Sequence, residues 1–360
     1  MCDKTEMNIF KNNQTPFAIV CAALCYTFTL SQIAANIATA DQPTLIIVQG
    51  ASGQEEYGKA FSVWRDRWIA SGKRGQAQTL VIGDDQKTNS KSQLKQLLTK
   101  QDNQHQTQPL WLVFLGHGTF DGTTAKFNLK GPDVSATELA NWLEPIRRPI
   151  VFINCSSSSA PFLTIAKEHA AAQANRPSTE ASQLVRCIAI TATKSGHEMN
   201  FSRFGDFLSA SIADPKADID KDGQTSLLEA YLLASQRTQA FYDTDNRLAT
   251  EQALLDDNGD GFGTPAAFFK GVRAVKKAEN SASLDRLTSH QIHLVPSERE
   301  RNMPPAIKAK RNALERKLEV LRQKRNALGD DSYFKLVEPI AYELAKLYDL
   351  LDSKTQSQSN

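Results

Sequence analysis

The segment Leu110-Trp-Leu-Val-Phe-Leu-Gly-His117-Gly118 places a continuous apolar run directly before a histidine and a glycine. A second run, Ile150-Val-Phe-Ile-Asn-Cys155-Ser156, ends in the same way at a cysteine. Continuous apolar character is typical of strands that are buried on both faces of a parallel sheet. Further β-rich runs, separated by amphipathic helical patterns, begin at Thr44, Gln78 and Cys187. We therefore expect an α/β domain over residues 41–212, with a mostly parallel sheet and helices on both faces.

If the two quoted strands are neighbours, His117 and Cys155 lie side by side at the carboxyl edge of the sheet, where ligand chemistry gathers in such folds. An imidazole beside a thiol can take its proton, and the thiolate can then attack a carbonyl carbon. The N–H groups of Gly118 and Cys155 are candidates for an oxyanion hole. The alternative is a satisfied strand-end histidine and a small buried hydrophobe. Cys187, inside an apolar strand, is expected to be a core residue.

This order of motifs, a strand with His-Gly and then a strand with Cys-Ser, resembles the caspase–legumain clan of cysteine peptidases. The legumain branch is the most similar, because Val48-Gln-Gly-Ala-Ser-Gly-Gln-Glu-Glu-Tyr57 resembles its glycine-rich, tyrosine-bearing loop. The resemblance covers roughly residues 43–212. It implies a caspase-hemoglobinase fold and hydrolysis of peptide bonds. It also implies that Cys155 is the nucleophile and that His117 is the general base and acid.

The predicted substrate pocket departs from the legumain pattern. Glu55 and Glu56 stand in the loop where legumains carry the basic residues that bind an asparagine side chain. Acidic residues there favour a Lys or Arg side chain of a protein or peptide substrate. His197, in a loop after a later strand, is a further pocket candidate, with a solvated loop residue as the alternative. A catalytically inactive scaffold or interaction protein on the same fold is the alternative function.

The loop Asp218-Ile-Asp-Lys-Asp-Gly-Gln-Thr-Ser-Leu-Leu-Glu229 matches the twelve-residue calcium loop of EF-hands and has helical patterns on both sides. Its predicted ligands are Asp218, Asp220, Asp222, Gln224 and Glu229. A weaker candidate loop carries Asp256, Asn258 and Asp260, but Ala267 stands at its twelfth position. Calcium, structural or regulatory, is therefore the predicted cofactor, and no organic cofactor is expected. The alternative for both loops is a solvated acidic turn.

Residues 1–40 have the order of a secretory signal peptide. Lys4 and Lys11 precede an apolar run over 17–30, and Ala38-Thr-Ala40 forms a small-residue cleavage site. Cleavage there predicts a secreted or periplasmic protein without a membrane segment, and an uncleaved membrane anchor is the alternative. Only Cys155 and Cys187 follow residue 40, too few for a disulfide framework, so they form one bridge or at least one remains a free thiol.

Composition bounds the remaining classes of function. The 360 residues include 42 basic and 40 acidic side chains, and a net charge of +2 creates no field that favours nucleic acid. The expected segments are a helical region with the acidic loops over 213–274, a linker over 275–302, an antiparallel helical hairpin over 303–352 and a disordered tail over 353–360. Basic residues of the hairpin fall between heptad leucines, so we expect it to pack on the domain or on a partner subunit rather than on a polyanion.

Overall fold

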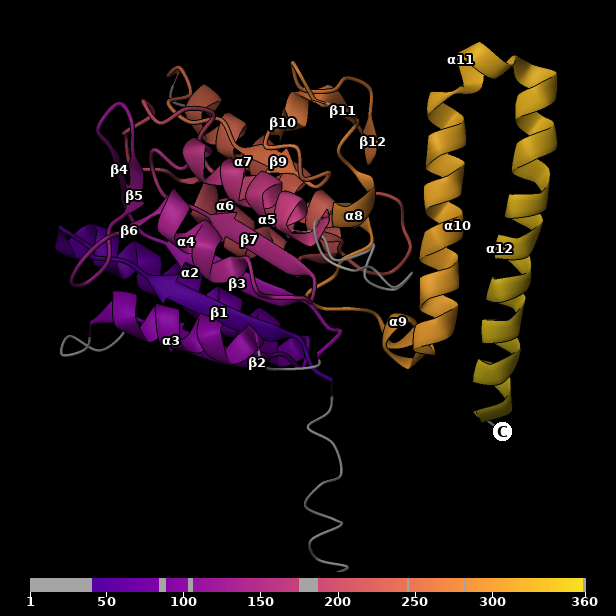
Figure 1. Cartoon of the computed structure of the whole chain (residues 1–360), viewed down its shortest axis with the longest axis horizontal. Helices are drawn as coiled ribbons and strands as arrows, with labels where there is room; N and C mark the ends of the chain where they lie inside the picture. The colour runs from indigo at the N-terminus through magenta and orange to yellow at the C-terminus, as the bar shows by residue number, and fades with distance from the viewer. Residues whose placement is uncertain are drawn as a thin grey trace, which may run out of the picture. The chain divides into compact units, whose positions relative to one another are not determined.

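The computed structural model describes residues 41–83, 89–102, 106–174, 187–244, 246–281 and 283–358. The predicted signal peptide lies outside the described residues. A seven-stranded sheet of order β10-β9-β8-β7-β3-β1-β2 forms the centre of the fold (Figure 1).

Most strands of this sheet run parallel. The parallel strands are β1 (Thr44–Gln49), β2 (Gln78–Ile82), β3 (Leu110–Leu115), β7 (Ile150–Asn154) and β8 (Cys187–Thr191). At the β8 edge, β9 (Leu254–Asp256) and β10 (Thr264–Pro265) continue the sheet in antiparallel pairing. Every residue of β1, β3, β7 and β8 is buried, as their continuous apolar sequences require. The predicted fold class, a mostly parallel sheet with helices on both faces, is confirmed.

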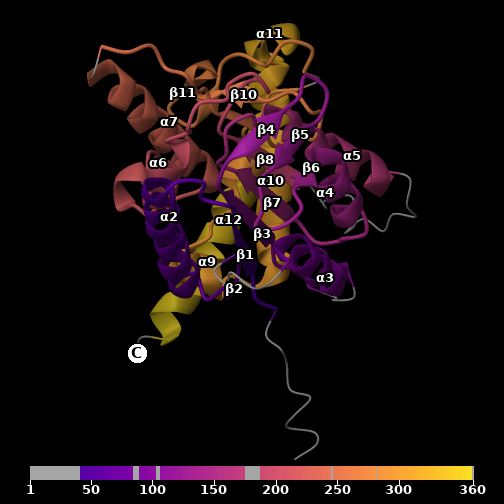
Figure 2. The same cartoon turned by 90° about the vertical axis from the view of Figure 1, so that its left-hand side faces the viewer.

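Helices cover both faces of the sheet and create two apolar layers (Figure 2). One layer contains α3 (Ser90–Asp102), α4 (Ala136–Leu143) and α5 (Thr164–Ala174). The other contains α2 (Glu55–Arg74), α6 (Phe204–Ser211) and α7 (Leu227–Thr244). Successive side chains of each strand enter opposite layers, because the side-chain period of a strand is two.

Short elements follow the edge at which β3 and β7 end. A three-stranded sheet of β4 (Gly118–Phe120), β5 (Ala125–Phe127) and β6 (Val134–Ser135) begins directly after His117. The 3-10 helix η1 (Ala160–Leu163) leads from the loop after β7 into α5. The loops after β3 and β7 are therefore the two that surround the predicted dyad.

Residues 213–274 are not purely helical, which corrects the sequence-based prediction. The 3-10 helix η3 (Pro215–Ala217) precedes α7, and the strands β9 and β10 follow it. The 3-10 helix η4 (Ala266–Phe268) and a hairpin of β11 (Phe269–Lys270) and β12 (Arg273–Ala274) complete the region. These strands are too short to carry a periodic signal, and it is their pairing that makes them strands: β9 pairs with β8, β10 with β9 and β11 with β12.

Residues 275–302 are packed against the domain and are not a free linker. They contain the short helices α8 (Leu287–His290) and α9 (Glu298–Asn302). Asp285, Ser289 and Leu294 in this stretch are fully buried. Composition suggested a linker because the stretch is polar, but its polar groups find partners in the acidic loops, as the site below illustrates.

The predicted helical hairpin is formed by α10 (Pro305–Gln323), α11 (Arg325–Leu328) and α12 (Asp330–Gln358). Ion pairs join α10 to the preceding stretch, Arg311 to Glu300 at 2.5 Å and Glu319 to Arg286 at 2.6 Å. The prediction of a disordered tail from Ser353 is wrong as far as Gln358, because no glycine or proline follows to end the helix.

Residues Gln42–Asn360 form one compact unit. Within the described ranges, no helix is both long enough and apolar enough to span a bilayer.

Candidate active site and acidic loops

β3 and β7 are direct neighbours, as the sequence motifs require. They pair in parallel, and the N–H of Cys155 extends the ladder by donating to the carbonyl oxygen of Phe114 at 2.9 Å. His117 and Cys155 thus leave the sheet at the same edge. The loops that carry them also touch, because the N–H of Gly118 donates to Oγ of Ser157 at 3.2 Å. The predicted juxtaposition of the two motifs is confirmed.

The imidazole of His117 lies in an aromatic cage. The ring centroids of Tyr57, Phe61 and Phe201 lie 5.0, 5.2 and 5.9 Å from its own. Its Nε2 is 3.1 Å from the carbonyl oxygen of Ser52. Because a carbonyl only accepts, Nε2 donates and carries the proton, and Nδ1 is the nitrogen that is left to act as a base.

The side chain of Cys155 is fully buried, with 0% exposure. It packs against the first turn of α6, where a Cβ added to Gly205 would lie 2.8 Å from Cβ of Cys155 and from the ring of Trp64. Burial, and then the negative charge of Glu251, raises the pKa of the thiol far above its usual value. Among the described residues, no hydrogen bond joins this thiol to the imidazole of His117. The thiol and the imidazole thus lie on adjoining loops without a hydrogen bond between them in the described part of the chain, and the thiol is neutral.

The two amides predicted to form the oxyanion hole are occupied in this arrangement. The N–H of Cys155 belongs to the sheet ladder through Phe114, and the N–H of Gly118 donates to Ser157. Glycine is required at 118, because a Cβ there would lie 2.2 Å from the carbonyl oxygen of Ser157. The prediction that both amides face a substrate is therefore wrong for this conformation. The physical reason is that backbone donors at the end of a buried strand are satisfied by their neighbours.

Bonds that the sequence does not reveal hold the loop after Cys155. The N–H of Ser159 donates to Oγ1 of Thr193 at 2.8 Å. Ser158 has a left-handed φ of 54°, and its N–H donates to the carbonyl oxygen of Glu198 at 2.9 Å. The loop after β7 is thus tied to the loop after β8. The sequence around this loop does not predict these bonds, because the partners follow a strand that is distant in the sequence.

The candidate pocket residues do not gather around the thiol. Glu55 and Glu56 are exposed in the first turn of α2, and Glu55 pairs with Lys59 at 2.7 Å. His197 is exposed, and its ring centroid lies 5.2 Å from that of Phe120 in β4. The described residues therefore form no acidic subsite from these glutamates, because the helix begins at Glu55 and turns both side chains toward solvent.

Cys187 is a core residue, as predicted, with 2% exposure in β8. Both it and Cys155 are free thiols. Cys187 lies opposite Ile150 at the start of β7, whereas Cys155 follows the end of that strand. The single bridge that the sequence left open is not formed, because a disulfide needs Cα atoms within about 7 Å.

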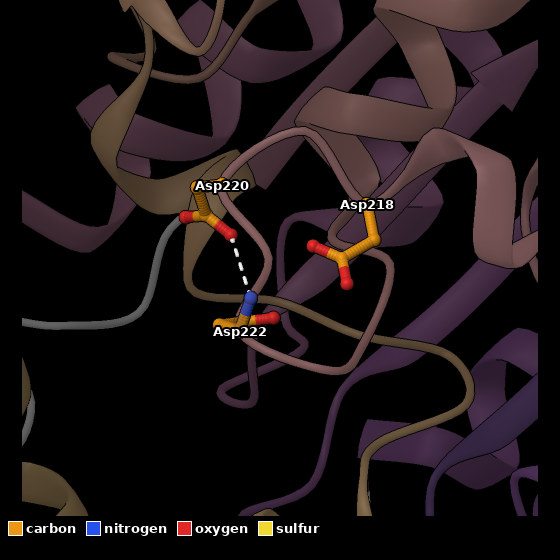
Figure 3. Close-up of side chains that lie close together, drawn as sticks. All are labelled: Asp218, Asp220 and Asp222. Carbon is orange, nitrogen blue, oxygen red and sulfur yellow. Dashed lines mark hydrogen bonds between the residues drawn. The ribbon is translucent and has the colours of Figure 1, made fainter.

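Asp218, Asp220 and Asp222 converge in the first acidic loop (Figure 3). One potential ligand atom from each lies within 4.8 Å of the others, and no other group of three His, Cys, Asp or Glu in the described ranges does so. Oδ1 of Asp218 is buried without a hydrogen-bond partner. Burial, and then the charges of Asp220 and Asp218, raises the pKa of Asp222. An orphaned carboxylate oxygen among repelling carboxylates fits a cation.

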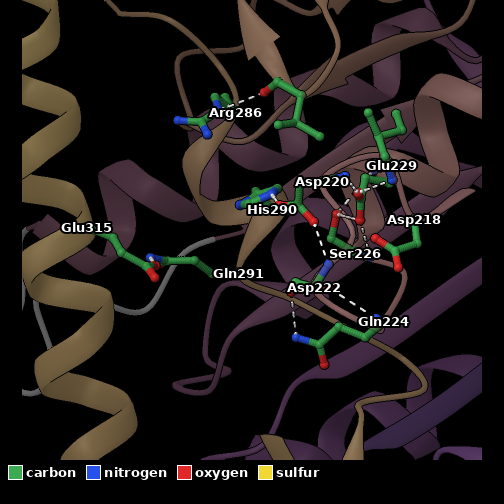
Figure 4. Close-up of polar contacts among 12 residues, drawn as sticks. Asp218, Asp220, Asp222, Gln224, Ser226, Glu229, Arg286, His290, Gln291 and Glu315 are labelled. Atoms are coloured by element: carbon green, nitrogen blue, oxygen red, sulfur yellow. Dashed lines mark hydrogen bonds and ion pairs between the residues drawn. The ribbon is translucent and has the colours of Figure 1, made fainter. Parts of the chain in front are cut away.

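The two other predicted ligands, Gln224 and Glu229, belong to the same loop (Figure 4). The ligand expected from Gln224 is its carbonyl at the seventh position, and the carboxylate of Glu229 bonds to N–H groups of the loop itself. Oε1 of Glu229 accepts from the N–H of Ile219 at 2.7 Å, and Oε2 accepts from the N–H of Ser226 at 2.9 Å. The side-chain oxygen of Gln224 accepts from the N–H of Ser297 at 3.0 Å. Chelation by Glu229 would require its carboxylate to leave these donors.

The second acidic loop repeats the turn of the first. Oδ2 of Asp256 accepts from the N–H of Gly261 at 2.8 Å. In the first loop, Oδ2 of Asp218 accepts from the N–H of Gly223 at 3.2 Å. Asn258 and Asp260 both bond to Oγ of Ser281, at 3.3 and 2.6 Å. Burial raises the pKa of Asp256 to about 7. The side chains of Asp256, Asn258 and Asp260 thus all bond to other groups of the protein.

Comparison with known proteins finds no family and only distant structural similarity. No protein-family model matches the chain, and no curated protein does. A crystal structure of a protein from Geobacter sulfurreducens is 12% identical with a TM-score of 0.34, covering 54% of this chain and 89% of that one. Caspase-1 from Spodoptera frugiperda is 11% identical with a TM-score of 0.37, covering 60% of this chain and 86% of that one.

Proposed function

We propose that the chain is a cysteine endopeptidase of the caspase–legumain kind. The observation that carries the proposal is the pairing of β3 with β7, which brings the His-Gly and Cys-Ser motifs to one edge of the sheet. Neither motif is informative by itself. A nucleophile and a base at the ends of adjacent parallel strands, however, is an arrangement suited to nucleophilic catalysis.

In the proposed reaction, Nδ1 of His117 takes the proton of the Cys155 thiol, and the sulfur attacks the carbonyl carbon of the scissile peptide bond. The imidazolium then gives its proton to the leaving amine, and the C–N bond breaks to leave a thioester on Cys155. His117 next deprotonates a water molecule, which attacks the thioester and releases the carboxylic acid and the thiol.

The alternative is a catalytically inactive binding protein on the same fold. The full burial of Cys155 and its lack of a hydrogen bond to His117 within the described chain favour this alternative. The two proposals differ in whether the thiol is reached by substrate.

Peptide cleavage tests the proposal. The protein is incubated with a diverse peptide mixture, with and without calcium, beside Cys155→Ala and Cys187→Ala, and products are identified by mass spectrometry. We expect products from the wild type and from Cys187→Ala, and none from Cys155→Ala. Cleavage that persists in Cys155→Ala overturns the assignment, and no cleavage by any form supports the binding protein.

We further propose that the first acidic loop binds calcium, through Asp218, Asp220 and Asp222, with a structural or regulatory role. The buried, unpartnered Oδ1 of Asp218 supports this proposal. Calorimetric titration with calcium should detect a site that Asp218→Asn weakens at least about tenfold, since each carboxylate lost from such a loop lowers affinity. Asp243→Asn, in an exposed part of α7, is the matched control. Equal affinity in all three forms contradicts the proposal.

Export is proposed on the sequence of residues 1–40 alone. Expression with this segment in a bacterial host, followed by fractionation and N-terminal sequencing, should recover a chain that begins at Asp41 outside the cytoplasm. A full-length chain held in the membrane fraction would support the uncleaved anchor.

A further inference from the structure

The cover over Cys155 is a defined segment of chain. Phe201 stacks on Tyr57 with ring centroids 4.5 Å apart and an interplanar angle of 18°, and it lies 5.8 Å from Trp64. A few residues later, Gly205 rests against the Cys155 side chain. The segment 201–205 therefore closes both parts of the dyad at once, with Phe201 against the imidazole and Gly205 against the thiol.

One carboxylate holds this segment. Glu251, which is 5% exposed, accepts from the N–H groups of Arg203 and Phe204 at 2.8 and 3.0 Å and from Oγ of Ser202 at 2.6 Å. Tyr242 donates its hydroxyl to the same carboxylate at 3.0 Å. Glu251 thus supplies, from a distant loop, the N-terminal cap that α6 lacks from its own side chains.

The first three residues of the segment are held more weakly than the helix they lead into. Phe201 is only partly buried and Arg203 is exposed, whereas Phe204 and Gly205 lie in the buried first turn of α6. The attachments of the segment are the Glu251 bonds and the aromatic contacts, including the guanidinium of Arg203 at 5.7 Å from the Phe201 ring. Local opening of such a segment costs less than unfolding of the core.

We propose that residues 201–203 are a lid whose opening draws the first turn of α6, with Gly205, away from Cys155, and that Glu251 is the positioning residue that keeps it closed. The inference rests on the proposed peptidase function for its purpose, since the lid must move before a substrate reaches the thiol. Its physical content is independent of catalysis, because it concerns access to Cys155.

Thiol alkylation tests the lid without requiring activity. The full chain is treated with iodoacetamide under native conditions, and modification of Cys155 and Cys187 is followed separately by peptide mass spectrometry. Cys187 is an internal control for global unfolding, because it is buried in β8. We expect slow modification of both thiols in the wild type. Phe201→Ala and Glu251→Gln should each speed modification of Cys155 at least about tenfold and leave Cys187 unchanged.

Two further variants separate a lid from general weakening. Phe201→Tyr keeps the aromatic ring and should restore the slow rate. Phe269→Ala removes another partly buried ring of the same apolar layer and should change neither thiol. A wild-type Cys155 that reacts as fast as a free thiol overturns the lid, and so does a parallel rise at Cys155 and Cys187. If the variants behave as a lid requires but the protein cleaves no peptide, the lid proposal stands and the peptidase proposal is rejected.

Discussion

Nε2 of His290 lies 2.9 Å from Oδ2 of Asp220, so a side chain of α8 contacts one of the three converging carboxylates of the first acidic loop (Figure 4). The same stretch of chain bonds to the loop again through the N–H of Ser297 and the side chain of Gln224. A cation bound by Asp220 must therefore compete with the imidazole or displace it. Any calcium site here is coupled to the segment that leads into the hairpin.

This contact predicts that His290→Ala strengthens calcium binding. Removing the imidazole frees Oδ2 of Asp220, and one hydrogen bond of this kind corresponds to a gain of about 3- to 10-fold in affinity. Calorimetric titration measures the change, with Gln291→Ala as the control, because Gln291 bonds to Glu315 and not to the loop. Weaker binding in His290→Ala would mean that the imidazole is itself a ligand.

His117 and His197 should differ sharply in their effect on peptide cleavage. His117→Ala removes the proposed base and should lower kcat/KM at least about 100-fold, the usual contribution of a general base. His197 is exposed, with its ring centroid 5.2 Å from that of Phe120, so His197→Ala should change kcat/KM less than about 3-fold. Rates are compared on one peptide identified from the mixture. Equal losses in the two variants would remove His117 from its assigned role.

The ion pair that joins α9 to α10 should stabilise the fold in a pH-dependent way. Burial alone would raise the pKa of Glu300, but hydrogen bonds and charge from Arg311 and Lys308 lower it to about 2. A lowered carboxyl pKa stabilises the folded state above the unfolded pKa, and this contribution is lost as the pH falls from about 4.5 towards 2. Glu300→Gln should lower the free energy of unfolding by about 3 kcal/mol at pH 7.

Urea unfolding of the wild type and Glu300→Gln, measured at several pH values, tests this prediction. The difference between the two proteins should shrink below about pH 4.5. Glu298→Gln, at an exposed position in the first turn of α9, is the control. A difference that stays constant down to pH 3 would contradict the assignment.

Asp285 should change stability with pH in the direction opposite to Glu300, so that the folded protein is less stable at higher pH. Burial, and then the charges of Asp257 and Asp256, raises its pKa well above the usual value of a carboxyl. The folded protein therefore keeps this carboxyl protonated to a higher pH than the unfolded chain does, so stability falls as the pH rises above the unfolded pKa of about 4. Asp285→Asn mimics the protonated form and should flatten this slope.

Thermal unfolding between pH 5 and 9 in the presence of a calcium chelator measures the slope for the wild type and Asp285→Asn. Asp243→Asn, an exposed aspartate in α7, should retain the slope of the wild type. An unchanged slope in Asp285→Asn would show that other groups dominate the titration.

The sequence by itself determined the parallel sheet and the edge at which the two motifs meet. Strands such as Leu110–Leu115 and Ile150–Asn154 are apolar throughout, and a strand of this kind is stable only when both faces are covered. The convergence of Asp218, Asp220 and Asp222 was also predictable, because these residues follow a fixed local spacing. Both patterns are local in the sequence, so they can be recognised without knowing which distant residues are in contact.

Only the tertiary structure decided what surrounds Cys155 and His117. Phe201, Gly205 and Glu251 carry no local pattern. They reach the site because α6 and α7, with the loops beside them, cover the same face of the sheet. The same holds for the outward turn of Glu55 and for the short strand β9, which exists through its pairing with β8. Periodicity and spacing encode which face of an element is apolar, whereas the partner that covers that face is set by long-range packing.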